Sequence, residues 1–242
     1  PTPLTLVLNN VQDVACNGEA TGALSVTAGG GAGGYTYSWS GGLGDTPDPT
    51  GLTAGSYSLT VTDLNGCTIF DAYTIAEPTE LVTVIEPDGI ADIDCFGENS
   101  GSIAVEVSGG SPPYTYLWSN SATTEDISGL SAGSYSLTVT DTNGCTTVSQ
   151  FLLTEPEPLE LQLSGTDVNC FDGADGGIEL EVNGGVDPYS YTWSLNGNFF
   201  SSSEDLTDLQ AGEYSLLLED ANGCTIDTRS EEHTSELQSL LI

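Results

Sequence analysis

Six cysteines carry the most reactive side chains of this chain, and they recur at regular intervals. Half of them follow an aspartate by three residues, and the other half directly follow Asn-Gly: the first set is Cys16, Cys95 and Cys170, and the second is Cys67, Cys145 and Cys224. No Cys-x-x-Cys pair or nearby histidine accompanies them, so metal binding by these thiols is not expected. We predict that all six form disulfides, which implies an oxidising compartment outside the cytosol.

Repeat symmetry leaves two pairing schemes out of the many that six cysteines allow. In the first, each repeat closes on itself, and the pairs are Cys16–Cys67, Cys95–Cys145 and Cys170–Cys224. In the second, the pairs cross from one repeat to the next as Cys67–Cys95 and Cys145–Cys170. We prefer the first scheme, because a unit that is copied many times should carry its own cross-link. Closing a loop of roughly 50 residues would stabilise each unit by about 4 kcal/mol in the chain-entropy model.

Carboxylates form the second group that could do chemistry, by binding calcium. Asp63, Asp141 and Asp220 open Asp-x-Asn-Gly turns, which share residue types with the first half of an EF-hand loop but lack its distal bidentate glutamate. Asp172 and Asp175 in Asp-Gly-Ala-Asp-Gly are a somewhat better set of oxygen ligands. The alternative, which we favour, is that these carboxylates accept hydrogen bonds from turn N–H groups. No other cofactor is expected.

The third group is an aromatic row, Tyr114, Tyr116 and Trp118, which shares one face of a strand because side chains alternate. If that face points inward, the rings belong to the core, and Trp118 packs near the disulfide as in immunoglobulin domains. If it points outward, the rings form a flat platform for stacking on sugars. We favour the core interpretation and keep glycan contact as the alternative.

Composition excludes several classes of function. The chain has 36 acidic residues and one basic residue, so nucleic acid and anionic lipid should be repelled. No apolar run is long enough for a membrane span. The only histidine, His233, and the only arginine, Arg229, lie near the C-terminus, and lysine is absent from the chain. Triads that need histidine, Schiff bases and phosphate-binding loops are therefore not expected, and we predict that the protein is not an enzyme.

The elements that must position these residues are strands in three repeats. Tryptophans recur at Trp39, Trp118 and Trp193, each in Tyr-x-Tyr-x-Trp-Ser. Alternating segments such as Leu59-Thr-Val61 read as half-buried strands, and Asn-Gly before each hairpin cysteine predicts a tight two-residue turn with positive φ at both positions. Repeats of this length with frequent turns indicate small β-sandwiches.

We therefore predict an all-β chain of three tandem immunoglobulin-like (PKD-like) β-sandwich repeats in an extended rod. The expected boundaries are 1–78, 79–156 and 157–228, with the last strand of the third repeat incomplete. Glu-Pro at the ends of the first two repeats predicts stiff, extended junctions. Residues 229–242 break the pattern, resemble a translated sequencing adapter and are expected to be non-native. The chain contains no methionine, and we expect it to be an internal part of a longer protein.

The ordered motifs resemble the SprB-type repeat of large surface adhesins of gliding bacteria. The second copy shows the resemblance best, through Pro-Pro-Tyr-Thr-Tyr-Leu-Trp ending at Trp118, Ala-Gly-Ser-Tyr ending at Tyr135, Asp-Thr-Asn-Gly-Cys ending at Cys145, and Glu155-Pro156. The resemblance implies secretion, an extracellular location at the bacterial cell surface, and a part in adhesion or gliding. It also implies contact with extracellular surfaces or polysaccharides, through this region or other parts of the protein. We expect a structural stalk; the alternative is a polysaccharide-binding module that uses the strand aromatics with the assistance of calcium.

Overall fold

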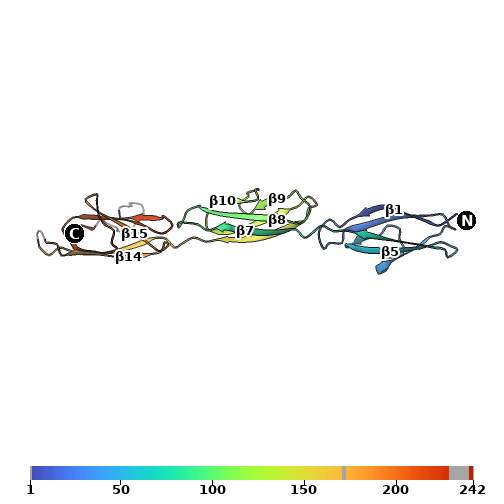
Figure 1. Ribbon diagram of the computed structural model, residues 1–242, viewed down its shortest axis with the longest axis horizontal. Coiled ribbons are helices and arrows are strands. Elements are labelled where there is room, and N and C mark those ends of the chain that lie inside the picture. The colour runs from blue at the N-terminus through green and yellow to red at the C-terminus, as the bar shows by residue number, and fades with distance from the viewer. Residues whose placement is uncertain (1, 171–172, 229–239, 242) are drawn as a thin grey trace. The chain divides into compact units, whose positions relative to one another are not determined.

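A computed structural model describes residues 2–170, 173–228 and 240–241 (Figure 1). The described residues form strands, turns and one short 3-10 segment, Ser40–Gly42, and include no α-helix. None of their segments is a helix long and apolar enough to cross a membrane. The chain is therefore all-β, as the sequence predicts.

The first repeat consists of two three-stranded antiparallel sheets. One sheet has the order β1-β2-β4, formed by Thr5–Gln12, Gly22–Gly29 and Thr50–Leu52. The other has the order β3-β5-β6, formed by Thr36–Trp39, Gly55–Thr62 and Thr68–Ile75. Figure 1 shows β1 and β5 in different layers.

The second repeat has the same strand order, and the third has it with an additional edge strand, β16 (Asn198–Ser201). In the second, the sheets are β7-β8-β10 (Val82–Ala91, Gly101–Ser108, Ile127–Leu130) and β9-β11-β12 (Thr115–Trp118, Gly133–Thr140, Thr146–Leu153). In the third, they are β13-β14-β17 (Glu160–Thr166, Gly176–Asn183, Leu206–Leu209) and β16-β15-β18-β19 (Asn198–Ser201, Ser190–Leu195, Glu213–Glu219, Thr225–Asp227). The short strand β20 (Leu240–Leu241) pairs with β18. The rest of the predicted non-native tail, 229–239 and 242, lies outside the described residues.

Alternating strands supply both halves of each core. In the first repeat, Leu24 and Val26 of β2 belong to the same buried cluster as Trp39 of β3 and Leu59 and Val61 of β5. The third repeat repeats this arrangement, with Ile178, Leu180, Trp193, Leu216 and Leu218. Burial of aliphatic side chains from two sheets is what holds a sandwich together.

A tyrosine near the start of the strand before the cysteine hairpin marks the immunoglobulin-like fold in each repeat: Tyr57 in β5, Tyr135 in β11 and Tyr214 in β18. The Tyr57 hydroxyl donates to the backbone carbonyl of Thr53 at 2.8 Å. Tyr135 and Tyr214 donate to the carbonyls of Ser131 and Gln210 in the same way. This hydrogen bond back to the preceding loop is the tyrosine corner of immunoglobulin-like sandwiches. The predicted fold class, three tandem immunoglobulin-like repeats, is confirmed.

Compact packing divides the chain into two units: Pro1–Glu86 with Val105–Glu125 and Ser136–Gln150, and Pro87–Ala104 with Asp126–Tyr135 and Phe151–Ile242. The second repeat contributes to both units. Apart from β20, which joins the second sheet of the third repeat, the strands of each sheet nevertheless lie within one of the predicted ranges 1–78, 79–156 and 157–228. The division into three domains, and their arrangement as a rod, stay predictions.

The predicted two-residue turns before the hairpin cysteines are wrong. In the hairpin of the second repeat the Gly144 N–H donates to the Asp141 carbonyl at 3.1 Å, and Gly144 alone in this turn has a positive φ, 85°. A four-residue turn therefore ends on a left-handed glycine. The two-residue turn occurs elsewhere, at Asn196-Gly197 between β15 and β16, where φ is 50° and 81°. Positive φ at both central residues fits a type I′ turn.

Candidate functional site at the repeat junctions

Two disulfides connect successive repeats, and they are the main chemical feature of the described chain. Cys16 of the first repeat bonds Cys145 of the second, and Cys95 of the second bonds Cys224 of the third. Both have a Cα–Cα distance of 5.6 Å and a sequence separation of 129. Each bond lies within one compact unit. A loop cysteine of one repeat is thus joined to the hairpin cysteine of the next.

Both predicted pairing schemes are wrong. Cys16 lies in the loop between β1 and β2, whereas Cys67 lies in the hairpin between β5 and β6. That hairpin packs at the far end of β2, where the Ala32 N–H donates to Asp63. Eight residues of β2 separate the two ends, about 25 Å at the rise of a strand. Since a disulfide requires Cα atoms within about 7 Å, a repeat cannot close on itself.

The second scheme, Cys67–Cys95 and Cys145–Cys170, is wrong for the same topological reason. The hairpin of each repeat lies at the end away from the junction with the following repeat. Cys95 and Cys145 are instead bonded to Cys224 and Cys16. The predicted disulfides at Cys67 and Cys170 are not present within the chain, and both residues are free and exposed.

One asparagine side chain supports each inter-repeat disulfide. The Asn143 Nδ2 donates to the Ala15 carbonyl at 3.0 Å, next to Cys16. The Asn222 Nδ2 donates to the Asp94 carbonyl at 2.9 Å, next to Cys95. Asparagine two residues before the hairpin cysteine therefore makes the same bond at both junctions. These two contacts assign Asn a role in joining repeats as well as in the turn.

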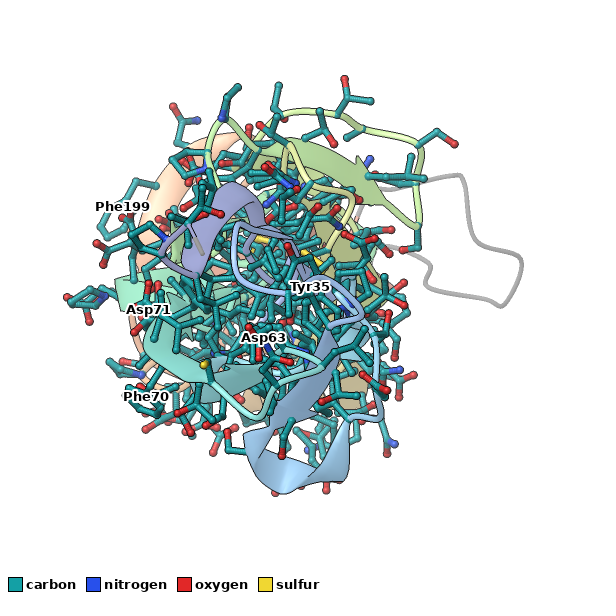
Figure 2. The ribbon with its side chains drawn as sticks, turned by 90° about the vertical axis from the view of Figure 1, so that its right-hand side faces the viewer. Tyr35, Asp63, Phe70, Asp71 and Phe199 are labelled. Atoms are coloured by element: carbon teal, nitrogen blue, oxygen red, sulfur yellow. A yellow bond between two sulfur atoms is a disulfide. The ribbon has the colours of Figure 1, made fainter. Side chains whose placement is uncertain are left out.

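The aspartate at the head of each hairpin shapes the turn that presents the cysteine. Asp141 Oδ1 accepts hydrogen bonds from the N–H groups of Asn143 and Cys145 at 2.8 and 2.9 Å. Asp141 Oδ2 accepts one from Ser111 at 2.8 Å. Asp63 and Asp220 accept the equivalent three bonds. All three aspartates are buried, and Asp63 lies inward of the outward-pointing Phe70 in Figure 2.

These hydrogen bonds change the acidity of the carboxylates. For Asp63, the N–H groups of Ala32 and Cys67 are the main cause of a pKa below the ordinary 3.8. For Asp141, burial by itself would raise the pKa, but the N–H groups of Ser111, Cys145 and Asn143 outweigh it, and the pKa is lowered. Hydrogen bonds to the charged form favour it.

The same geometry argues against Asp63, Asp141 and Asp220 as calcium ligands. Both oxygens of each carboxylate face N–H groups, whose positive ends occupy the positions that a cation would take. These residues therefore act as turn acceptors, the alternative that the sequence favoured. The described residues contain no group of three or more His, Cys, Asp or Glu side chains that could hold a metal ion.

Asp175, another calcium candidate, occupies the position that a serine or threonine has in the first two repeats. There the hydroxyl accepts a hydrogen bond from the residue before the loop cysteine. The Ala15 N–H donates to Thr21 Oγ1 and the Asp94 N–H donates to Ser100 Oγ, both at 2.8 Å. In the third repeat the Asn169 N–H donates to Asp175 Oδ1 at 3.1 Å. In all three repeats the acceptor lies six residues after the donor. The Asn169 side chain is the main cause of a lowered pKa at Asp175. Asp172 lies outside the described residues.

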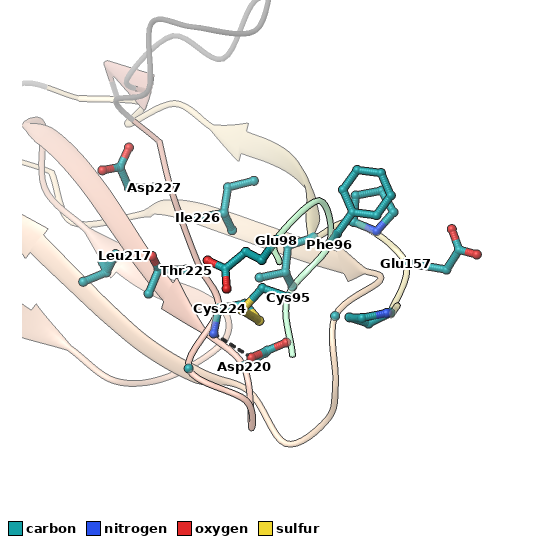
Figure 3. A pocket seen from close by; sticks show the side chains of 15 residues that line it. Cys95, Phe96, Glu98, Glu157, Leu217, Asp220, Cys224, Thr225, Ile226 and Asp227 are labelled. Carbon is teal, nitrogen blue, oxygen red and sulfur yellow. Dashed lines mark hydrogen bonds between the residues drawn. A yellow bond between two sulfur atoms is a disulfide. The ribbon is translucent and has the colours of Figure 1, made fainter. Parts of the chain in front are cut away.

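Glu-Pro at the end of a repeat also folds onto its cysteine loop. Glu77 Oε2 accepts a hydrogen bond from the Gly18 N–H at 2.7 Å, and Glu155 Oε2 accepts one from Gly97 at 2.8 Å. In the second unit, a hollow of about 540 Å³ lies beside the disulfide and is lined by Phe96, Glu98 and Pro156 among others. Figure 3 shows Cys95 and Cys224 bonded at its centre, with Asp220 reaching the Cys224 N–H. Three elements therefore meet at this junction: the loop, Glu-Pro and the next hairpin.

The aromatic row faces the interior. Trp118 is 2 % exposed, Trp39 and Trp193 are similarly buried, and Tyr114 and Tyr116 are half-buried. The Tyr114 hydroxyl donates to the Gly109 carbonyl at 2.6 Å. A sugar platform on Tyr114, Tyr116 and Trp118 would need at least two open rings, so the burial of this row argues against the glycan-contact alternative. The two disulfides lie in end loops and join successive repeats, so neither connects the two sheets of one repeat as in antibody domains.

Comparison with protein families decides the identity of the three segments. The family model of the SprB repeat matches residues 8–44, 89–123 and 164–198. These three segments are similar to the SprB repeat, as the sequence motifs predict. Each match runs from the first strand of the repeat, through the cysteine loop, past the strand that carries the tryptophan. No curated protein matches the chain.

Solved structures with some similarity consist of immunoglobulin domains. Sidekick-1 immunoglobulin domains 1–5 match with a TM-score of 0.39 and 13 % identity, over 94 % of this chain and 58 % of that one. Titin domains I67–I69 match with a TM-score of 0.40 and 17 % identity, over 94 % and 96 %. These scores are too low to carry an argument, so the fold is assigned from the SprB repeats, the sheet order and the tyrosine corners.

The junction is what sequence reasoning missed, although a signal for it was present. In an immunoglobulin-like sandwich, the loop after the first strand and the hairpin before the last strand lie at opposite ends. Applied to Cys16 and Cys67, that rule would have excluded closure within a repeat.

Proposed function

We propose that these repeats form an inextensible stalk in a secreted protein of the bacterial cell surface, which holds an adhesive part away from the cell. The observation that carries the proposal is the disulfide between successive repeats. It occurs twice, each time between a loop cysteine and a hairpin cysteine at equivalent positions, with the same asparagine contact beside it. A binding module would not need to join its copies covalently. A stalk under tension, by contrast, is protected from stretching by covalent connections between its repeats.

The covalent connections limit how far the chain can stretch. Cys16 and Cys224 are separated by 208 residues, which could extend to about 730 Å at 3.5 Å per residue. With both disulfides intact, the shortest covalent path between them crosses to Cys145, returns to Cys95 and crosses again. That path contains 50 residues and extends to about 175 Å. Even complete loss of the folded sheets would not separate Cys16 and Cys224 by more than this limit.

Secretion to the cell surface is part of the same proposal. Disulfides persist in oxidising environments outside the cytosol, and the SprB repeat resembles segments of large surface adhesins. Adhesion to extracellular surfaces or polysaccharides is assigned to other parts of the protein, since the aromatic row of these repeats is turned inward. A part in gliding follows only from the family resemblance. A non-catalytic role is supported by the recurrent aspartates, which are engaged by backbone N–H groups.

Single-molecule stretching of the full chain, with handles at its two ends, tests the stalk. The contour length after unfolding should increase by about 550 Å when a reductant opens both disulfides. The double variant Cys67→Ser/Cys170→Ser keeps both disulfides and is the matched control; it should behave like the parent chain. An equal contour length before and after reduction would contradict the proposal, as would saturable binding of the chain to a polysaccharide panel.

A further inference from the structure

Two half-junctions remain open in the described chain. Cys67 has the position that Cys145 and Cys224 have in their hairpins, and Cys170 has the position of Cys16 and Cys95 in their loops. Both Cys67 and Cys170 are free and exposed, whereas the four equivalent residues are half-buried and bonded. The open halves are thus one hairpin and one loop, the two parts of a junction.

The open hairpin already has the shape of the bonded ones. Asp63 Oδ1 accepts hydrogen bonds from the N–H groups of Asn65 and Cys67, both at 2.9 Å. The corresponding distances at Asp220 are also 2.9 Å. Formation of a disulfide at Cys67 therefore requires no rearrangement of its turn.

The open loop is held in the same way as the bonded loops. The N–H of the residue before the cysteine donates to the side chain six residues on, at Ala15, Asp94 and Asn169 alike. In the bonded loops, the carbonyl of this residue accepts the hydrogen bond from the asparagine of the next repeat. The Asn169 carbonyl has the corresponding position beside Cys170.

We propose that Cys67 and Cys170 each form a disulfide with a further SprB repeat, Cys67 with a loop cysteine and Cys170 with a hairpin cysteine. A second copy of this chain supplies both partners, so that Cys170 of one copy bonds Cys67 of the next, and the Asn65 amide donates to the Asn169 carbonyl. The inference deepens the proposed stalk function, because the same covalent junction then continues beyond the described repeats.

The bond forms by thiol–disulfide exchange with a small disulfide such as oxidised glutathione. The Cys67 thiolate attacks one sulfur of the oxidant and releases one glutathione thiolate. The Cys170 thiolate of the second chain then attacks the Cys67 sulfur of the mixed disulfide and releases the second glutathione. The two thiol protons end on the two released glutathiones, and the two cysteine sulfurs, which are oxidised as their bond forms, pass two electrons to the glutathione disulfide.

Two single variants of the full chain test the inference. Cys67→Ser keeps only the free thiol of the open loop, Cys170, and Cys170→Ser keeps only the free thiol of the open hairpin, Cys67. Each is incubated alone and as an equimolar mixture in a glutathione redox buffer. Salt at about 0.15 M limits the repulsion between the two highly acidic chains. Non-reducing electrophoresis measures dimers, and mass spectrometry of digested dimers identifies the bonded cysteines.

The mixture should form a dimer that contains only the Cys170–Cys67 bond, about tenfold more than either variant alone. Adding Asn65→Asp to Cys170→Ser should slow dimer formation about fivefold, because a carboxylate faces the Asn169 carbonyl where the amide would donate. Its Cys67 should still react normally with a small maleimide, which shows that the thiol remains accessible.

Equal amounts of Cys67–Cys67, Cys170–Cys170 and mixed dimers would overturn the inference, as would the absence of any dimer while maleimide labels both thiols. Either result would leave the stalk proposal standing if stretching still shows the short contour length. Conversely, binding of a polysaccharide would contradict the passive stalk and leave the cysteine pairing unaffected. The two proposals can therefore fail separately.

Discussion

The hairpins Asp63–Cys67 and Asp141–Cys145 have nearly the same sequence and the same internal hydrogen bonds, yet their cysteines differ completely. Cys145 is half-buried and bonded to Cys16 of the preceding repeat. Cys67 is exposed and free. In both turns the aspartate accepts hydrogen bonds from the N–H groups of the asparagine and the cysteine of its own hairpin.

This difference separates what a repeat determines by itself from what its neighbours determine. The local sequence fixes the turn, the position of the cysteine and the direction of the asparagine. The partner comes from the preceding repeat, whose loop lies at the shared junction. The cross-link is therefore a property of the array, and a single repeat contains two unpaired cysteines.

The largest difference between the two hairpins is expected when the cysteine of each is replaced by serine. Cys145→Ser opens a loop with a sequence separation of 129 and should lower the free energy of unfolding by about 5 kcal/mol in the chain-entropy model. Cys67→Ser removes an exposed thiol and should change it by less than about 0.5 kcal/mol. Urea unfolding of both variants measures the difference.

Thiol labelling provides the control for this pair of variants. Unreduced parent protein should take up maleimide at Cys67 and Cys170 alone. Cys145→Ser should add a label at Cys16, because its partner is gone, while Cys67→Ser should lose one label. Protection of Cys67 in the monomeric parent chain would contradict the pairing described here.

A smaller effect is expected from the aspartates, and it should be similar in the two hairpins. Asp63 and Asp141 have lowered pKa values in the folded protein, so they stabilise it above the ordinary pKa of 3.8. That stabilisation is lost as the pH falls through the lower, folded value. Asp141→Asn should cost about 1 to 2 kcal/mol at neutral pH, like the loss of a helix cap. Asp63→Asn should act in the same direction.

The test is the difference between parent and variant, since the many other carboxylates also titrate. The unfolding free energy of the parent minus that of Asp141→Asn should be largest at pH 6 to 7, within the range where aspartate is charged, and should shrink towards pH 3. A difference that does not change with pH would show that the carboxylate charge is not what closes the turn.

Much of the fold follows from the sequence because alternation and core burial are local signals. Leu59 and Val61 are buried as their alternation predicts, and Trp39, Trp118 and Trp193 belong to strands whose inward face the period of two specifies. The role of Asp63 was also predictable, since a short acceptor before Asn-Gly can bond the turn N–H groups.

The disulfide pairing was not predictable from spacing, because it depends on which end of a sandwich each loop occupies. Turn type was wrong for a similar reason: the carboxylate of Asp141 stabilises a four-residue turn, while Asn196-Gly197, with no such aspartate before it, forms the two-residue turn. Asp175 was a weak calcium candidate because of its acidic type, and its equivalence to Thr21 and Ser100 emerged only from the hydrogen bonds of the loop.

The smallest effect should come from the asparagines, and it isolates the non-covalent part of the junction. Asn143 Nδ2 donates to the Ala15 carbonyl and to Ser111 Oγ, both at 3.0 Å. Asn143→Ala should therefore lower the free energy of unfolding by about 1 kcal/mol. Asn65→Ala in the open hairpin should have almost no effect on the monomer, because among the described residues its side chain has no acceptor of this kind.

Urea unfolding of the two alanine variants, each with both disulfides intact, measures this difference. If Asn65→Ala cost as much as Asn143→Ala, the asparagine would act only within its own turn, and the contact with the preceding repeat would contribute nothing. A cost confined to Asn143→Ala would instead show that the asparagine stabilises the junction beyond the covalent bond. Because the asparagine aligns the loop carbonyl beside the cysteines, it would then favour the correct partner before the disulfide forms.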